Sequence, residues 1–180
     1  MNGFLAVTAI RELKALAHLK KDNSTVQWLD GLQNTLTGNL QRHAWKNGAF
    51  ARLLFNQYPG FSYAGADDDG LDTDSGGGTF FLNSFSWSVL SGVADDGQIA
   101  SMLKLVKEKL KTPFGLKLVS PNDLSRVVPD AASSEYFPGD RENGAVFKHA
   151  GMMAVTAMLE AAKKSRTEHL QKNSPQKPGP

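Results

Sequence analysis

Cysteine is absent from this chain of 180 residues. Its absence excludes a disulfide framework, a thiolate metal site and a cysteine nucleophile. No apolar run reaches the roughly 18 residues that a membrane-spanning helix needs, so the sequence predicts no such helix. Residues 1–20 have no basic segment ahead of their apolar stretch and are not typical of a secretory signal. We therefore expect a cytoplasmic protein without a membrane partner.

A strong charge of either sign is also missing. The 20 Lys and Arg residues nearly balance the 18 Asp and Glu residues, which leaves a net charge of +2, so nucleic acid is not an expected partner. The hydrophobic share of 41% suits a globular domain. Basic residues gather near the end of the chain, beside Pro and Gly. We predict one domain over residues 1–164, followed by a disordered basic and Pro-containing tail over residues 165–180.

Helical periodicity dominates the first quarter of the chain. Over residues 4–19, one predicted face carries Ala6, Ile10, Leu13 and Ala17. Ser24 and Gln27 have the spacing of a capping box, which predicts the start of a second helix that runs to about Ala44. Its apolar stripe consists of Val26, Leu29, Leu32, Leu36 and Leu40. A short polar link between the two helices predicts an αα-hairpin.

Three more helices are predicted after residue 79. Residues 80–93 are apolar and aromatic, a pattern that fits a buried helix better than a buried strand. Asp95 or Asp96 is the expected cap of the next helix, and Pro113 its expected end. The last helix is predicted over residues 145–163, with a core face formed by Val146, Ala150, Met153 and Ala157. Because no strand alternation is evident, the fold class is predicted to be all-α.

An acidic, glycine-rich stretch over residues 59–78 is predicted to be a loop. Its aspartates do not fit a calcium-binding EF-hand, because Leu71 or Gly70 falls where a ligand is required. We interpret it as a solvated loop, and predict no metal site. Gly76–Gly78 lack the spacing of a phosphate-binding loop and indicate a hinge or a tight backbone passage.

A second loop, over residues 136–144, carries the candidate chemistry. Arg141 and Glu142 follow a Pro-Gly turn, and the loop leads directly into the last predicted helix, near His149. A carboxylate beside a guanidinium can accept from and donate to sugar hydroxyls. The N-terminus of a helix attracts anions, and an imidazole on its first turn adds a donor. The alternative interpretation is a surface ion pair and a boundary histidine.

Three segments, residues 81–92, 112–118 and 136–149, carry recognisable motifs in this order along the chain. They resemble motifs of glycoside hydrolase family 94, which includes cellobiose and chitobiose phosphorylases. Residues 136–149 resemble Tyr-Pro-Pro-Gly-x-Lys/Arg-Glu-Asn-Gly-Gly-x-Phe-x-His. Residues 81–92 are similar to Phe-Leu-Asn-x-Gln-x-Trp-x-Val-x-Ser-Gly, and residues 112–118 are similar to Thr-x-Tyr-Gly-Ile-Lys-Leu. The resemblance covers about residues 3–163.

The resemblance implies a fold, a reaction and roles for particular residues. The family fold is an (α/α)6 barrel, of which this chain would form a part. Its enzymes cleave a β-linked disaccharide or oligosaccharide with inorganic phosphate, invert the anomeric centre and release an α-sugar-1-phosphate, without a cofactor. The resemblance assigns the sugar site to Tyr136, Arg141 and Glu142, and phosphate binding to His149. Asn143 and Gly144 would shape the loop backbone.

No catalytic residue is assigned within the chain. The family's general acid is an Asp in a Trp-x-Asp-Gly motif that precedes the helix resembled by residues 3–19, so we expect it upstream of residue 1. Residues 28–31 look like that motif but follow the first helix, and we therefore interpret Asp30 as an ordinary helix residue. Phe85 and Ala145 depart from the motifs, which leaves the sugar and linkage open.

The sequence therefore predicts a fragment of a phosphorylase that is inactive by itself. An incomplete barrel would expose apolar inner helix faces, which favours association, and the parent enzyme is a candidate homodimer. Two alternatives stay open. One is a non-catalytic helical domain that binds carbohydrate or assembles with another chain, and the other is an inactive truncated gene product.

Overall fold

A computed structural model of the chain describes residues 1–55, 62–66, 68–123 and 136–172. The helices are α1 (Asn2–Leu19), α2 (Asn23–Ala44), α3 (Leu82–Leu90), α4 (Asp96–Leu105), the π-helical turn η1 (Val106–Leu110) and α5 (Lys148–Lys172). Short antiparallel pairs join β1 (Trp45–Lys46) to β2 (Ala49–Phe50), β3 (Leu53–Leu54) to β4 (Tyr63–Ala64), and β5 (Lys111–Thr112) to β6 (Gly115–Leu116). The predicted predominance of helix is confirmed, whereas the three strand pairs were not predicted.

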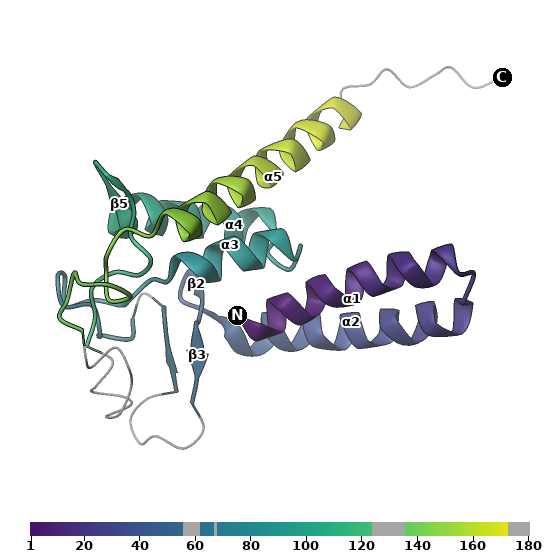
Figure 1. Cartoon of the computed structure of the whole chain (residues 1–180), viewed down its shortest axis with the longest axis horizontal. Helices are drawn as coiled ribbons and strands as arrows, with labels where there is room; N and C mark the ends of the chain where they lie inside the picture. The colour runs from purple at the N-terminus through teal and green to yellow at the C-terminus, as the bar shows by residue number, and fades with distance from the viewer. Residues whose placement is uncertain (56–61, 67, 124–135, 173–180) are drawn as a thin grey trace.

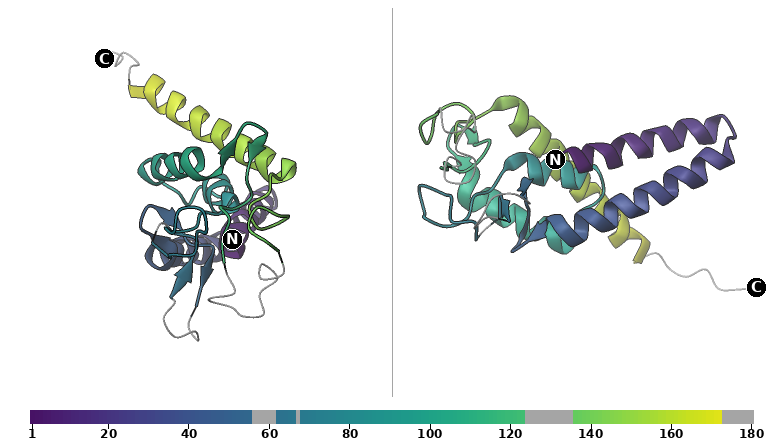
Figure 2. Two further views of the ribbon diagram at one scale, coloured as in Figure 1. Left: turned by 90° about the vertical axis from the view of Figure 1, so that its left-hand side faces the viewer. Right: turned by 90° about the horizontal axis from the view of Figure 1, so that it is seen from below.

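The helices form two groups. Helices α1 and α2 pack against each other as the predicted αα-hairpin, which projects from the remainder of the molecule (Figures 1 and 2). Helix α3 lies between the base of this hairpin and α5, with α4 beside it (Figure 1). The loops that carry the candidate site gather at the end of α3 opposite the tip of the hairpin. Within the described ranges, no helix combines the length and apolar character needed to cross a bilayer.

The buried face of α1 agrees with the predicted one in part. Ile10 and Ala17 are buried as predicted, together with Phe4 and Val7, whereas Leu13 is 52% exposed. Lys14, one residue later, turns inward and donates to Asp30 of α2 across 2.5 Å. The prediction was therefore wrong at Leu13, because the amphipathic stem of Lys14 lies against α2 there instead.

The cap of α2 is Asp22, and the predicted capping box of Ser24 and Gln27 is wrong. The helix begins at Asn23, so Ser24 already lies in its first turn. The Asp22 carboxylate accepts from the Thr25 amide at 3.0 Å, and the Ser24 and Thr25 hydroxyls also donate to it. These hydrogen bonds lower the pKa of Asp22 to about 2, and the bond from the Thr25 amide has the largest effect.

This cap predicts a pH-dependent stability of the hairpin. Because the folded-state pKa lies below the ordinary value of 3.8 for an aspartate, the cap stabilises fully above pH 3.8, and its contribution is lost as the pH falls toward about 2. Melting temperatures of the wild type and Asp22→Ala should therefore differ at neutral pH and converge near pH 2. A difference that persists unchanged at pH 2 would contradict this assignment.

The core lies where α3 meets α5 and the base of the hairpin. Phe50, Phe80 and Phe85 are fully buried there. Helix α5 offers them a face of small residues that allows close approach: Ala150, Ala154 and Ala157. Of the predicted face, Ala150 and Ala157 are confirmed, whereas Val146 precedes the helix and bridges to Lys117.

The ends of the later helices also differ from prediction. Asp95 caps α4 in a full capping box with Gln98, which confirms one of the two predicted caps. The helical segment ends at Leu110, three residues before Pro113, because residues 111–116 form the β5–β6 hairpin. Helix α5 starts at Lys148 and continues to Lys172. Residues 165–172 of the predicted tail are therefore helical, and residues 173–180 lie outside the described ranges.

Candidate functional site

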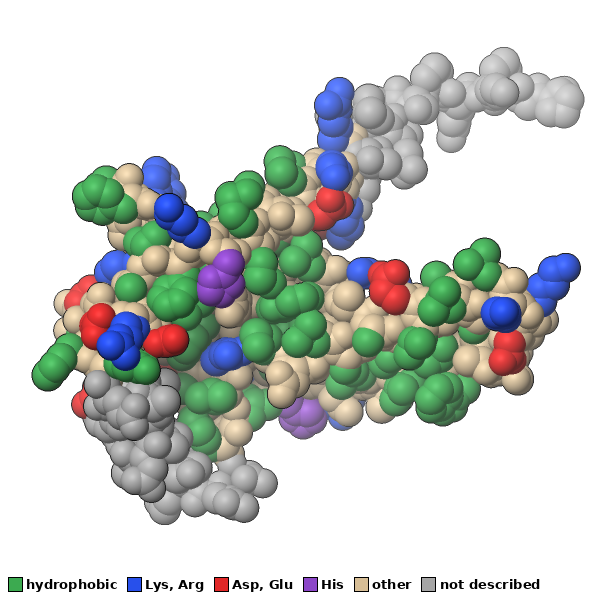
Figure 3. All heavy atoms as spheres, viewed as in Figure 1, with side chains coloured by type: hydrophobic (Ala, Val, Ile, Leu, Met, Phe, Trp, Pro, Cys, Tyr) green, Lys and Arg blue, Asp and Glu red, His purple; other side chains and the backbone are tan. Residues whose placement is uncertain are grey.

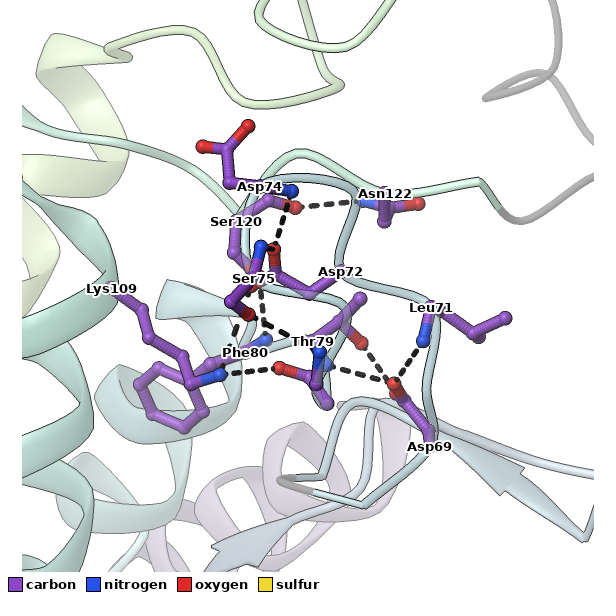
Figure 4. Close-up of polar contacts among 12 residues, drawn as sticks. Asp69, Leu71, Asp72, Asp74, Ser75, Thr79, Phe80, Lys109, Ser120 and Asn122 are labelled. Atoms are coloured by element: carbon purple, nitrogen blue, oxygen red, sulfur yellow. Dashed lines mark hydrogen bonds and ion pairs between the residues drawn. The ribbon is translucent and has the colours of Figure 1, made fainter.

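The acidic loop is an ordered turn built around Asp69. Its carboxylate accepts from the amides of Gly65, Leu71 and Thr79 at 2.6, 3.0 and 2.8 Å, and from the Thr79 hydroxyl at 2.5 Å (Figure 4). A carboxylate with this many backbone donors fixes the path of the chain rather than facing solvent. The predicted solvated loop is therefore wrong for this part, while residues 59–61 and Asp67 lie outside the described ranges.

Asp72 organises the adjoining turn. It is 5% exposed and accepts from the amides of Asp74 and Ser75. Lys109 of η1 lies 3.7 Å from its carboxylate and donates to the Gly78 carbonyl at 2.7 Å. A Cβ at Gly76 would meet nothing within 4 Å, so a tight backbone passage is not shown, and both predicted interpretations of the triglycine stay predictions. Among the described residues, no group of three or more His, Asp or Glu side chains could hold a metal ion.

Beyond this turn, three segments distant in sequence lie side by side. The Leu82 amide donates to Leu118, and the Ser120 amide donates to Phe80. The Phe80 amide in turn donates to the Ser120 hydroxyl at 3.0 Å (Figure 4). On the other side, the Leu118 amide donates to the Ala145 carbonyl, so the end of the 136–144 loop lies beside this segment. This pairing builds the floor of a pocket.

Asn143 fixes the loop that covers this floor. Its side chain is 1% exposed, accepts from the Asn122 amide at 2.8 Å, and donates to the carbonyls of Asn122 at 2.7 Å and Tyr136 at 3.1 Å. Gly144 has a φ of +99°, and a Cβ there would lie 2.8 Å from Pro121 Cγ. Both residues therefore shape the loop backbone, as the resemblance implied.

The resulting cavity, which we call the Arg52 pocket, has a volume of about 260 Å³. Its floor is apolar and includes Phe81 and Val119. Its polar lining comes from four residues on separate segments: Arg52, Asn83, Asn122 and Glu142. Glu142 is therefore the predicted sugar-site residue that the fold brings into a pocket. A small apolar cavity with a few convergent polar groups is typical of a ligand site.

Several polar groups around this pocket lack protein partners. Asn122 is 2% exposed, and the Oδ1 atoms of Asn83 and Asn122 are buried without a hydrogen bond. The Arg52 guanidinium lies 6.0 Å from the centre of the Phe81 ring, and burial lowers its pKa. It makes no ion pair with any residue that the structure describes. Unsatisfied buried polar groups are uncommon and indicate a missing partner.

The other predicted site residues lie outside the Arg52 pocket. The Arg141 guanidinium stacks 5.1 Å from the centre of the Tyr136 ring, and their hydrogen bond raises the pKa of Arg141. His149 is exposed on the first turn of α5, with its ring 5.5 Å from that of Phe147. None of the three lines the pocket. Asp30 remains on the hairpin, paired with Lys14.

Two pocket residues were missed at the sequence level. Asn122 and Arg52 stand in segments where no motif was recognised, and only the fold brings them beside Glu142. Asn83 belongs to a motif that was recognised, but it was not singled out. The one available signal was that Asn83 is polar in an otherwise apolar helix start, where an Asn side chain often binds a ligand or caps the backbone.

Comparison with known proteins gives one family match. Residues 1–173 match the catalytic domain of the glycosyl hydrolase 94 superfamily. A cellobionic acid phosphorylase of Neurospora crassa is 32% identical over 124 residues, which cover 66% of this chain and 14% of that protein.

Two similar proteins come from Paenibacillus borealis. A 3-O-beta-D-glucopyranosyl-beta-D-glucuronide phosphorylase is 27% identical over 159 residues, or 87% of this chain and 19% of that protein. A solabiose phosphorylase is 31% identical over 80 residues, or 44% of this chain and 10% of that protein. The chain thus spans less than a fifth of the length of each of these relatives.

Proposed function

Since this chain belongs to the glycosyl hydrolase 94 superfamily, we propose that it forms one side of the active site of an inverting phosphorylase. The substrate is a β-linked disaccharide or oligosaccharide, and the co-substrate is inorganic phosphate. The helix pairs α1–α2 and α3–α5 would belong to an (α/α)6 barrel whose other helices lie outside these residues. The names of the three relatives, all phosphorylases, support this proposal.

The observation that carries the proposal is the placement of Glu142. Its carboxylate lines the Arg52 pocket, and the neighbouring Asn143 holds the loop with three hydrogen bonds. Glu142 itself is exposed, and a carboxylate beside an apolar floor is suited to accept hydrogen bonds from sugar hydroxyls. Tyr136 and Arg141 would contact the same sugar from the outer edge of the loop, where their stacking limits the motion of both side chains.

Phosphate changes what the protein must supply. An inverting glycosidase needs an acid for the leaving oxygen and a base that activates water. Phosphate is already an anionic nucleophile, so direct displacement needs no base and inverts the anomeric centre to give an α-sugar-1-phosphate. The general acid would come from outside these residues. His149, on the first turn of α5, would donate to phosphate beside the backbone amides of the helix start.

Ligand titrations of the isotopically labelled chain test these assignments. Cellobiose should shift the amide resonances of residues 136–149, and Glu142→Gln should weaken its binding at least tenfold, whereas the matched surface variant Glu160→Gln should not. Inorganic phosphate should shift the amides at the start of α5, and His149→Ala should abolish that effect while His43→Ala leaves it. The isolated chain should form no sugar-1-phosphate.

Three results would contradict the proposal. Unchanged cellobiose affinity in Glu142→Gln would remove the assigned sugar contact. Unchanged phosphate binding in His149→Ala would remove the assigned phosphate contact. Sugar-1-phosphate formation by the isolated wild type, lost in Glu142→Ala, would show that the general acid lies within these residues.

A further inference from the structure

The chain contains three Asn-Gly pairs, at residues 2–3, 47–48 and 143–144. An asparagine that precedes glycine loses its side-chain amide readily, because glycine has no Cβ to hinder the attack of its own amide nitrogen. We propose that Asn47 is a modification site, at which spontaneous deamidation converts the side-chain amide into a carboxylate. The product breaks the contact between the β1–β2 turn and Asp68 of the acidic loop.

The structure distinguishes Asn47 from the other two asparagines. Asn47 is exposed in the turn between β1 and β2, where it and Gly48 have φ values of +36° and +86°. The Gly48 amide donates to no group in the part of the chain that the structure describes, so its nitrogen is free to attack. In contrast, Asn143 is 1% exposed and three hydrogen bonds hold its side chain. Asn2 begins α1, whose first turn fixes its backbone.

The reaction needs only water as a co-reactant. The Gly48 amide nitrogen attacks Cγ of Asn47, the Cγ–Nδ2 bond breaks, and the proton of the Gly48 amide leaves with Nδ2 as ammonia. The resulting five-membered imide takes up one water, and opening at one or the other carbonyl carbon gives aspartate or isoaspartate. The net change exchanges ammonia for water and turns a neutral side chain into an anion at neutral pH.

The new charge lies against an existing carboxylate. The Asn47 amide donates to the Asp68 carboxylate, which also accepts from the Tyr63 hydroxyl at 2.7 and 2.8 Å. Deamidation replaces this donor with an acceptor, so an attraction becomes a repulsion between like charges. Tyr63 lies in β4, where the Ala64 carbonyl accepts from the Arg52 amide at 2.8 Å. Loss of the contact therefore loosens the strand pair beside the Arg52 pocket.

Peptide mapping by mass spectrometry tests the site. The full chain is incubated in mildly alkaline buffer, and samples are digested over several days. Asn47 should convert at least tenfold faster than Asn143, with isoaspartate among its products. Unfolding in urea should remove most of this difference, because both asparagines are then equally accessible. Asn39, which is exposed on α2 but precedes leucine, is the internal control and should stay intact.

A charge exchange tests the consequence. Asn47→Asp should accelerate hydrogen exchange at the Arg52 amide at least fivefold and lower the melting temperature, whereas Asn39→Asp should change neither. The double variant Asn47→Asp/Asp68→Asn again places an amide donor opposite a carboxylate. It should recover most of both losses, which a turn that merely misfolds would not do.

Two results would overturn the inference, and neither depends on sugar or phosphate binding. Conversion of Asn47 no faster than that of Asn143 in the folded chain would remove the proposed site. Unchanged exchange of the Arg52 amide after conversion, or no recovery in the double variant, would remove the proposed consequence. If circular dichroism shows that Asn47→Asp does not fold, wild-type protein compared before and after conversion gives the same measurement.

Discussion

Asp69→Ala is expected to lower the free energy of unfolding by at least about 3 kcal/mol, because hydrogen bonds to a charged group contribute about 1.5–3 kcal/mol each and several are lost together. Three backbone amides and one hydroxyl would lose their acceptor in a turn that the chain cannot rebuild locally. Urea denaturation monitored by tryptophan fluorescence measures the change. Asp69→Asn, which keeps one acceptor oxygen, should cost about half as much.

The neighbouring acid provides the control. Asp74 is exposed, and its carboxylate lies 3.4 Å from Lys117 at the surface. Since exposed ion pairs contribute about 0–1 kcal/mol, Asp74→Ala should change the free energy of unfolding by less than about 1 kcal/mol. Equal effects of the Asp69 and Asp74 substitutions would show that the turn does not depend on the Asp69 carboxylate.

Asn143→Leu is expected to release the 136–144 loop from the pocket floor. The substitution keeps the side-chain volume but leaves the amide and carbonyl of Asn122 buried without partners. Each unsatisfied buried group costs about 1–3 kcal/mol, so a loss of about 2–4 kcal/mol is expected, together with loss of cellobiose binding because Glu142 is no longer held. Hydrogen exchange at the Asn122 amide should accelerate in parallel.

Asn39→Leu on the exposed side of α2 is the matched control. It should leave both the exchange of the Asn122 amide and the cellobiose affinity unchanged. If Asn143→Leu bound cellobiose as tightly as the wild type, the loop would not require the Asn143 side chain, and the link between this residue and the position of Glu142 would be refuted.

The sequence predicted the helices better than the segments between them. The hairpin, α3, the Asp95 cap and the small-residue face of α5 all follow from apolar spacing and capping chemistry. The inward position of Lys14 does not follow from them, because side-chain packing decides it. The cap of α2 at Asp22, two residues before the predicted Ser24, does not follow either, because neighbouring polar residues compete for the cap. The Asp69 turn was predicted to be a solvated loop. An acidic, Gly-rich segment has the same composition whether its carboxylates face water or accept hydrogen bonds from the backbone, so composition could not separate the two.

The site was predictable only where its residues form a local motif. Glu142 and Asn143 were identified because they stand together in one loop. Arg52, Asn122 and Glu142 come from segments far apart in the sequence that the fold brings to one pocket, and no spacing rule relates such residues. His149 lies on the helix start that was expected to attract an anion, although it does not line the Arg52 pocket.

The separation between the hairpin and the pocket bears on the order in which the chain folds. Helices α1 and α2 contact each other across a short turn (Figure 1), and hydrophobic side chains remain along their outer surface (Figure 3). Such local contacts form early and rapidly. The pocket, in contrast, joins Arg52 to Glu142 and closes only when Asn143 is available. During synthesis the hairpin therefore emerges and folds well before the pocket, and it must stay soluble through that interval with Leu16, Leu19 and Trp28 uncovered.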